Sequence, residues 1–153
     1  MSQKILVALD FSKLGRDVAD YGYELGAIFG AELTFMHVIP EPNVLLRSYS
    51  PSIPLILDKD MAELKKTAEK KLHHYIDEAC AKYTQSGLKC STHVEIGDSA
   101  QSIIEYASSE DFDMIVLGYR GHSVIDRLLV GSTASKVANY APCSVLIYRP
   151  KEQ

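Results

Sequence analysis

Five short apolar runs recur along the chain, and longer segments separate them. The runs are rich in Ile, Val and Leu with little polar alternation, as in strands that are buried on both faces of a sheet. We predict parallel strands at residues 5–9, 33–39, 89–96, 114–117 and 144–148. The run at 89–96 has the weakest pattern of the five.

Apolar residues recur at every third or fourth position between these runs, which is the spacing of an amphipathic helix. Ser12 is the expected N-cap of the first helix, and Gly30 is expected to end it. Gly15, Gly22 and Gly26 lower helix propensity inside it, so they predict close packing against the sheet. The predicted helices span 12–30, from Asp58 or Asp60 to about Gln85, 100–108 and 134–140.

Strict alternation of strand and helix predicts the α/β class, with a doubly wound sheet of five parallel strands and helices on both faces. The 153 residues suit one domain, 1–153. In such sheets, ligands bind at the carboxyl ends of the strands where the strand order reverses. If the first and fourth strands are neighbours there, the loops at 10–12 and 118–132 line one crevice.

Residues 41–57 form the longest segment without a clear period, and they include Pro51 and Pro54. Loops of this length in a compact domain usually have a function. Because the segment also contains several Leu and Ile residues, we expect it to fold over the domain or against a partner.

A glycine-bearing loop follows the fourth strand and leads into the last helix. Gly118, Gly121 and Gly131 let the backbone approach a ligand, and Ser132 and Thr133 add hydroxyl groups at the helix start. A helix N-terminus offers unpaired N–H groups and a partial positive charge. The pattern predicts a site for an anion such as phosphate. The same glycines also serve as turn and cap residues in sheets that bind nothing.

Two charged residues near this loop each have two interpretations. Asp10 ends the first strand, where it either contributes to the site or caps the first helix. Arg120 either reaches the phosphates through charge-assisted hydrogen bonds or points to water. Within 118–133 there is no P-loop lysine, and no second acidic residue stands beside the glycines. We therefore expect slow hydrolysis of a bound phosphate compound at most, and no other enzymatic activity.

The formal net charge of −4 gives no support to a nucleic-acid partner. The lysine pairs at 65–66 and 70–71 are interleaved with Glu63 and Glu69, which indicates a solvated helix face. Cys80, Cys90 and Cys143 lack metal-ligand spacing and are interpreted as reduced thiols. We expect no signal peptide, no membrane span and a cytoplasmic protein.

The glycine spacing Gly118-x2-Gly121-x9-Gly131-Ser132 resembles that of the nucleotide-binding branch of the universal stress protein family. The resemblance covers essentially the whole chain. Further segments that resemble the family are Ile5 to Asp10, His37-Val38-Ile39, Leu128 to Ser132 and Ala141-Pro142-Cys143.

This resemblance implies a Rossmann-like fold of the adenine nucleotide alpha hydrolase type that binds ATP or AMP, with Mg or Mn held through the phosphates. Asp10 matches the family aspartate near the ribose and the metal, and the Val38 backbone matches the adenine contact. The ligand-binding residues implied are Ala8, Leu9, Asp10, Val38, Leu117, Gly118, Arg120, Gly121, Gly131, Ser132 and Thr133.

The resemblance also implies a homodimer through the strand Ser144–Tyr148. It implies a stress-response regulator whose state depends on nucleotide occupancy and which acts on a downstream protein. Tyr119 departs from the family, where small hydroxyl residues are common, and its ring either crowds the ribose or lies outward. The alternatives are a slow ATPase or adenylate-transferring enzyme on the same scaffold, and an interaction module that binds no nucleotide.

Overall fold

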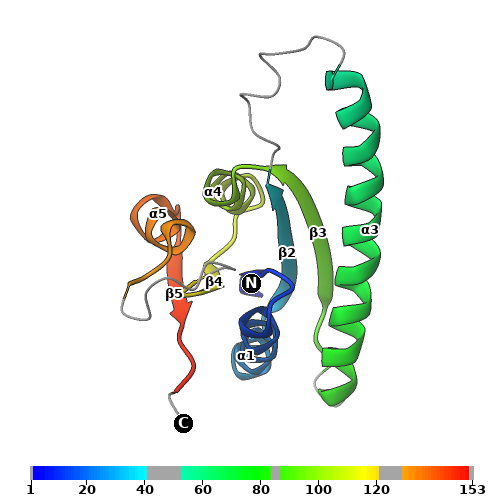
Figure 1. Ribbon diagram of the computed structural model, residues 1–153. Helices are drawn as coiled ribbons and strands as arrows, with labels where there is room; N and C mark the ends of the chain where they lie inside the picture. Colours follow the sequence, from blue (N-terminus) through cyan, green and yellow to red (C-terminus); the bar gives the residue numbers. More distant parts are fainter. Residues whose placement is uncertain (1, 41–52, 84–86, 121–128, 152–153) are drawn as a thin grey trace.

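A computed structural model describes residues 2–40, 53–83, 87–120 and 129–151, with the backbone alone for 53–59. Five strands and four helices alternate along these ranges (Figure 1). Their bounds are β1 Lys4–Ala8, α1 Lys13–Phe29, β2 Glu32–Pro40, α3 Ile53–Lys82, β3 Cys90–Gly97, α4 Ser99–Ser109, β4 Met114–Gly118, α5 Ser132–Tyr140 and β5 Ser144–Tyr148.

The five strands form one parallel sheet in the order β3-β2-β1-β4-β5. Helices α1 and α3 pack on one face, and α4 and α5 pack on the other (Figure 1). This confirms the predicted doubly wound α/β fold. Strands β1 and β4 are neighbours, so the strand order reverses between them as expected.

Strand β1 contributes to both hydrophobic cores because its side chains alternate between the two faces. Ile5 and Val7 belong to the core under α1 and α3, whereas Leu6 and Ala8 belong to the core under α4 and α5. Because both faces of β1 are buried, each of its positions after Lys4 is apolar, and this explains the unbroken apolar run at residues 5–9.

Two glycines of α1 allow the helix to lie directly on the sheet. A Cβ atom at Gly22 would lie 2.7 Å from Cγ2 of Val7, and one at Gly26 would lie 2.8 Å from Cδ1 of Leu33. Gly30 ends the helix in the left-handed conformation, with φ of 62°, and its N–H bonds the Gly26 carbonyl. These contacts confirm the predicted packing role of Gly22 and Gly26.

The long helix α3 begins at Ile53, so its predicted start at Asp58 or Asp60 was wrong. Pro54 lies in the first turn, where the missing N–H has no helical partner in any case. We had interpreted Pro54 as part of a loop covering 41–57. Residues 41–52 lie outside the described ranges, and the rest of that segment is helical.

The three cysteines are free thiols, as expected. Burial raises the pKa of Cys90 to about 11, which keeps its thiol protonated at neutral pH. Within the part of the chain that is described, none of the helices has the length and apolar character needed to cross a bilayer.

Candidate functional site

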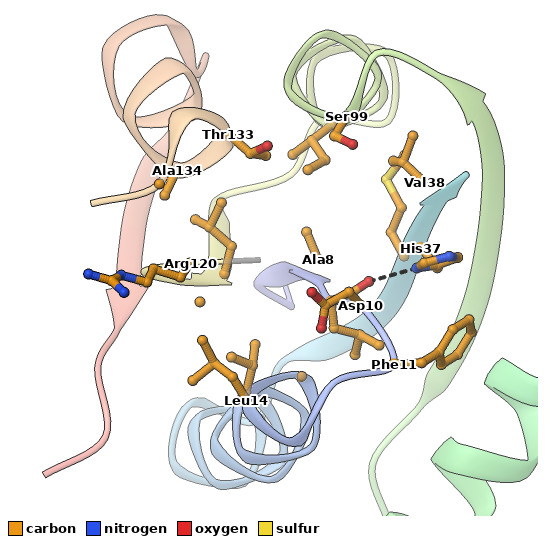
Figure 2. Close-up of a pocket in the computed structure, with 18 of the residues that line it drawn as sticks. Ala8, Asp10, Phe11, Leu14, His37, Val38, Ser99, Arg120, Thr133 and Ala134 are labelled. Carbon is orange, nitrogen blue, oxygen red and sulfur yellow. Dashed lines mark hydrogen bonds between the residues drawn. The ribbon is translucent and has the colours of Figure 1, made fainter. Parts of the chain in front are cut away.

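A cavity of about 840 Å³ opens where the carboxyl ends of β1 and β4 meet the start of α5 (Figure 2). It brings together ten of the eleven residues that the sequence singled out. Gly121 lies outside the described residues. The ten are Ala8, Leu9, Asp10, Val38, Leu117, Gly118, Arg120, Gly131, Ser132 and Thr133.

Asp10 lies two residues beyond the end of β1 and lines the cavity near Ala8 (Figure 2). Its Oδ1 accepts a hydrogen bond from the backbone N–H of Ser12 at 3.0 Å and another from the Ser12 hydroxyl. The Ser12 oxygen in turn accepts from the N–H of Gly15 at 3.1 Å, which makes Ser12 the N-cap of α1, as predicted. Asp10 therefore orients the capping residue and also lines the cavity.

Gly15 lets the first turn of α1 lie against the main chain of Asp10. A Cβ atom at this position would lie 1.9 Å from the Asp10 carbonyl oxygen and 2.9 Å from its Oδ1. We had expected Gly15 to pack against the sheet, whereas its close neighbour is this cavity residue. A side chain at position 15 would therefore displace both the main chain and the carboxylate of Asp10.

One end of the cavity is apolar. Met36 and Val38 of β2 and Ile103 of α4 line it, and all three are buried. Ser99, the first residue of α4, adds a hydroxyl group beside Val38 (Figure 2). This end offers a flat polar heterocycle an apolar surface with a few hydrogen-bonding groups, which is the usual composition of a small-molecule site.

The other end of the cavity is the start of α5. Gly131 is the N-cap, and no side chain caps the helix there. The first intrahelical bond runs from the N–H of Ser135 to the Gly131 carbonyl at 2.9 Å. The N–H groups of residues 132–134 precede that bond, so they have no partner within the helix. Thr133 projects into the cavity from this turn (Figure 2).

Arg120 is bonded to its own loop. Its Nε donates to the Leu129 carbonyl at 3.2 Å, and the N–H of Gly131 donates to the Tyr119 carbonyl at 2.6 Å. The guanidinium lies away from Asp10 in Figure 2. In this structure Arg120 holds the two ends of the glycine loop together rather than reaching across the cavity.

Tyr119 faces outward. Its ring lies 5.3 Å from the Arg120 guanidinium carbon and 4.7 Å from that of Arg149, and the residue does not line the cavity. Its N–H donates to the Tyr148 carbonyl at 3.0 Å. Of the two interpretations of Tyr119, the structure shows the one that leaves the cavity clear.

Phe11, His37 and Lys71 also line the cavity, although the sequence assigned none of them a role in ligand binding. Phe11 lies in the 10–12 loop that was expected to line the crevice. The rings of Phe11 and His37 are 4.4 Å apart, and the Lys71 ammonium lies 4.4 Å above the Phe11 ring. The Nδ1 atom of His37 lies 3.0 Å from the Leu9 carbonyl, which can only accept, so Nδ1 carries a proton. Phe11 and His37 adjoin Asp10 and Val38 in sequence, but nothing in the sequence connects Lys71 with the site.

Tyr75 braces this side of the cavity from α3. Burial raises the pKa of its hydroxyl to about 12, so the group stays protonated and can donate to the Ser12 carbonyl, 3.4 Å away.

Asp10 is the one carboxylate among the described lining residues. The described ranges contain no group of three His, Cys, Asp or Glu side chains arranged for a metal ion. A divalent cation here would need ligands from a bound molecule as well.

A profile of the Universal stress protein family matches residues 1–149. The universal stress protein YxiE of Bacillus subtilis is 29% identical over 149 residues, which cover 97% of this chain and 100% of that protein. The solved structure of universal stress protein UspA from Lactobacillus plantarum has a TM-score of 0.81 at 25% identity, and covers 96% of this chain and 97% of its own.

Two more distant solved structures share the fold and contain a ligand. One is a universal stress protein in complex with cAMP, with a TM-score of 0.63 at 20% identity, covering 96% of each chain. The other is the universal stress protein from Archaeoglobus fulgidus in complex with dAMP, with a TM-score of 0.60 at 18% identity, covering 97% of this chain and 98% of that one. Since the family profile spans nearly the whole chain and these relatives share its fold, the chain belongs to the universal stress protein family.

Proposed function

We propose that the cavity binds an adenine nucleotide, ATP or AMP, and that the protein is a dimeric stress-response regulator whose state depends on nucleotide occupancy. The observation that carries this proposal is the position of the α5 start, which opens into the same cavity as the carboxyl end of β1. The cAMP and dAMP complexes of family members support an adenine nucleotide as the ligand.

The adenine ring would lie at the apolar end, against Met36, Val38 and Ile103. Backbone groups at the end of β2 can bond the edge of the base, and the Ser99 hydroxyl adds a donor and an acceptor. The phosphates would lie at the other end, on the N–H groups of residues 132–134 and the hydroxyl groups of Ser132 and Thr133. The ribose would then lie between these ends, beside Asp10.

Mg or Mn would enter with the phosphates, with Asp10 as its protein ligand. Mg²⁺ commonly binds through one or two carboxylates, substrate phosphates and water, and a single carboxylate fits that pattern. The bound cation would neutralise part of the phosphate charge. Asp10 would hold the phosphate chain in place through this cation, while Oδ1 of Asp10 keeps its hydrogen bonds to Ser12.

Asp10→Asn should weaken binding of Mg-ATP about tenfold or more, or about 1.4 kcal/mol, because an amide is a poor ligand for this cation. Its oxygen can still accept from Ser12, so stability should hardly change. Asp10→Ala should also lower the free energy of unfolding by about 1 kcal/mol. Thermal melts with ATP, each with magnesium and with EDTA, separate these effects. Equal magnesium-dependent stabilisation of wild type and Asp10→Asn would remove Asp10 from the metal site.

Bound ATP should be hydrolysed slowly at most. Fast phosphoryl transfer needs a group that orients or deprotonates the attacking water, and charges that stabilise the transferring phosphoryl. The ammonium group of Lys71 could supply such a charge, but it contacts Phe11, which lies on the side of the cavity away from Thr133 and the proposed phosphate site (Figure 2). Single-turnover hydrolysis with Mg or Mn should be far slower than the ~1–100 s⁻¹ of kinases. A rate within that range would make the protein an enzyme.

Nucleotide that co-purifies with the protein tests the proposed function. The protein is denatured after purification, and the released small molecules are identified by mass spectrometry. ATP or AMP in an amount comparable to the protein is the expected result. Adenylated co-substrate products would favour the transferase alternative, and protein that is empty and takes up no added nucleotide would favour the interaction module.

The dimer would form through β5, which is an edge strand of the sheet. The N–H of Tyr119 donates to the Tyr148 carbonyl, so the backbone groups of Tyr148 face β4. Because successive residues of a strand turn their N–H and C=O groups to opposite sides, the N–H of Ile147 points away from β4. The edge is therefore free to pair with a second copy of the strand.

Ile147→Pro should convert the dimer to a monomer, because it removes an outward donor without breaking a bond to β4. Ile147→Ala is the matched control, since it shortens the side chain but keeps the N–H. Light scattering at micromolar concentration measures the mass. A wild-type monomer, or a proline variant that remains dimeric, would refute an interface at β5.

A further inference from the structure

A second cavity, of about 420 Å³, lies between α3 and β3, two elements that run side by side in Figure 1. It shares no lining residue with the first cavity. Its lining residues are Lys65, Lys66, Glu69, Lys70, His73, Thr92, His93 and Val94.

The strand side of this cavity lies on the other edge strand of the sheet, β3. Leu33 pairs with Cys90, and its N–H bonds the Lys89 carbonyl. In a parallel ladder this register turns the N–H and C=O groups of Thr92 and Val94 away from β2. The second cavity therefore has backbone donors available at the sheet edge as well as side chains.

The helix side of the cavity is strongly basic. Lys65, Lys66 and Lys70 contribute three ammonium groups against the single carboxylate of Glu69. Among the described residues, none of the three lysines forms an ion pair. Lys65 is partly buried. This concentration of positive charge occurs in a chain whose net charge is −4. We had interpreted these lysines as a solvated helix face, and Lys66, Glu69 and Lys70 are exposed, as that interpretation expects. The same face forms one wall of the second cavity.

The wall beside the lysines is held in place by side-chain contacts between β3 and its neighbours. His73 Nε2 lies 3.2 Å from the Thr92 hydroxyl, which links α3 to β3. The His93 ring stacks on Tyr106 at 3.9 Å, and its Nε2 lies 2.7 Å from Glu95. The carboxylate of Glu95 is thus engaged with His93.

We propose that this second cavity binds a compact polyanion that carries two or more phosphate groups. Lysine binds phosphate as a point charge, and three ammonium groups against one carboxylate in one cavity attract a multiply charged anion. The edge N–H groups add directional donors. This site is independent of the nucleotide proposed for the first cavity.

The test is an amide-resolved NMR titration of the full chain with inorganic tripolyphosphate, in about 0.15 M salt to screen unspecific attraction. Saturable shifts should appear at the amides of His73, Thr92 and Val94. Lys66→Gln combined with Lys70→Gln should weaken this binding at least tenfold. Both lysines are exposed, so the fold should survive. The charge-matched control combines Lys136→Gln with Lys151→Gln, which lie outside the cavity, and should bind as the wild type does.

Three results would overturn the second site. One is the absence of saturable shifts at His73, Thr92 and Val94. Another is an equal loss of affinity in the control variant, which would show attraction by net charge alone. The third is a set of shifts confined to Ser132 and Thr133, which would place the anion in the first cavity. Failure of nucleotide binding there leaves the shifts at Thr92 and Val94 unaffected, so the two proposals fail separately.

Discussion

Gly15→Ala should lower the free energy of unfolding by about 3 kcal/mol, although alanine is the better helix former by roughly 0.5–1 kcal/mol. The added methyl group would stand 1.9 Å from the Asp10 carbonyl oxygen. That oxygen belongs to the main chain at the end of β1, so no side-chain rotation relieves the clash. The turn between β1 and α1 must move, and the Asp10 carboxylate must move with it.

Urea unfolding measures this effect, and Gly22→Ala is the matched control. The methyl group at residue 22 would meet a side-chain atom of Val7 at 2.7 Å, and that side chain can shift, so the loss should be smaller. Gly15→Ala should also lose nucleotide affinity more than Gly22→Ala does. A Gly15→Ala protein as stable as the wild type would show that this turn is not packed as described.

Thr133→Asp should weaken ATP binding at least about a hundredfold, or about 2.7 kcal/mol, while the protein keeps or gains stability. A carboxylate in the first turn of α5 interacts favourably with the helix dipole, by about 0.3–1 kcal/mol. The same charge would stand where the phosphates are proposed to bind, and like charges in a partly enclosed site repel strongly. Opposite signs for stability and affinity distinguish a phosphate site from a general structural role.

Gln101→Glu places an equal charge in the first turn of α4, where the side chain is exposed. It is the control for charge, and its ATP affinity should stay within a few-fold of the wild type. Calorimetry gives the affinities, and thermal melts give the stabilities. A Thr133→Asp protein that binds ATP normally would exclude the start of α5 as the phosphate site.

The sheet and the glycine loop at its switch point were predictable from local pattern, whereas cavity residues such as Val38 were implied by the resemblance to the family. Strands such as β1 are apolar on both faces, and Gly118 and Gly131 flank the loop before α5. Ser12 was identified as a cap because its hydroxyl acts within its own turn. In each case the decisive contact lies close in sequence or repeats with a fixed period.

The remaining features depend on contacts between distant segments. Lys71 reaches the first cavity because α3 packs beside Phe11. The two residues are sixty positions apart in sequence, and no local pattern indicates that they are in contact. The ring of Tyr119 contacts Arg149, a residue thirty positions away in sequence. The start of α3 was misplaced because proline is compatible both with loops and with the first turn of a helix. The lysines beside β3 were interpreted from their helix alone, without the strand that completes their cavity.

The most direct test of the central claim is a calorimetric titration of nucleotide-free protein with Mg-ATP and, separately, with AMP and Mg-GTP. The account predicts saturable binding of ATP or AMP at one site per chain, weaker binding of GTP, and loss of ATP binding in Thr133→Asp. Absence of binding by every nucleotide, or binding that Thr133→Asp leaves unchanged, would contradict an adenine nucleotide site in this cavity.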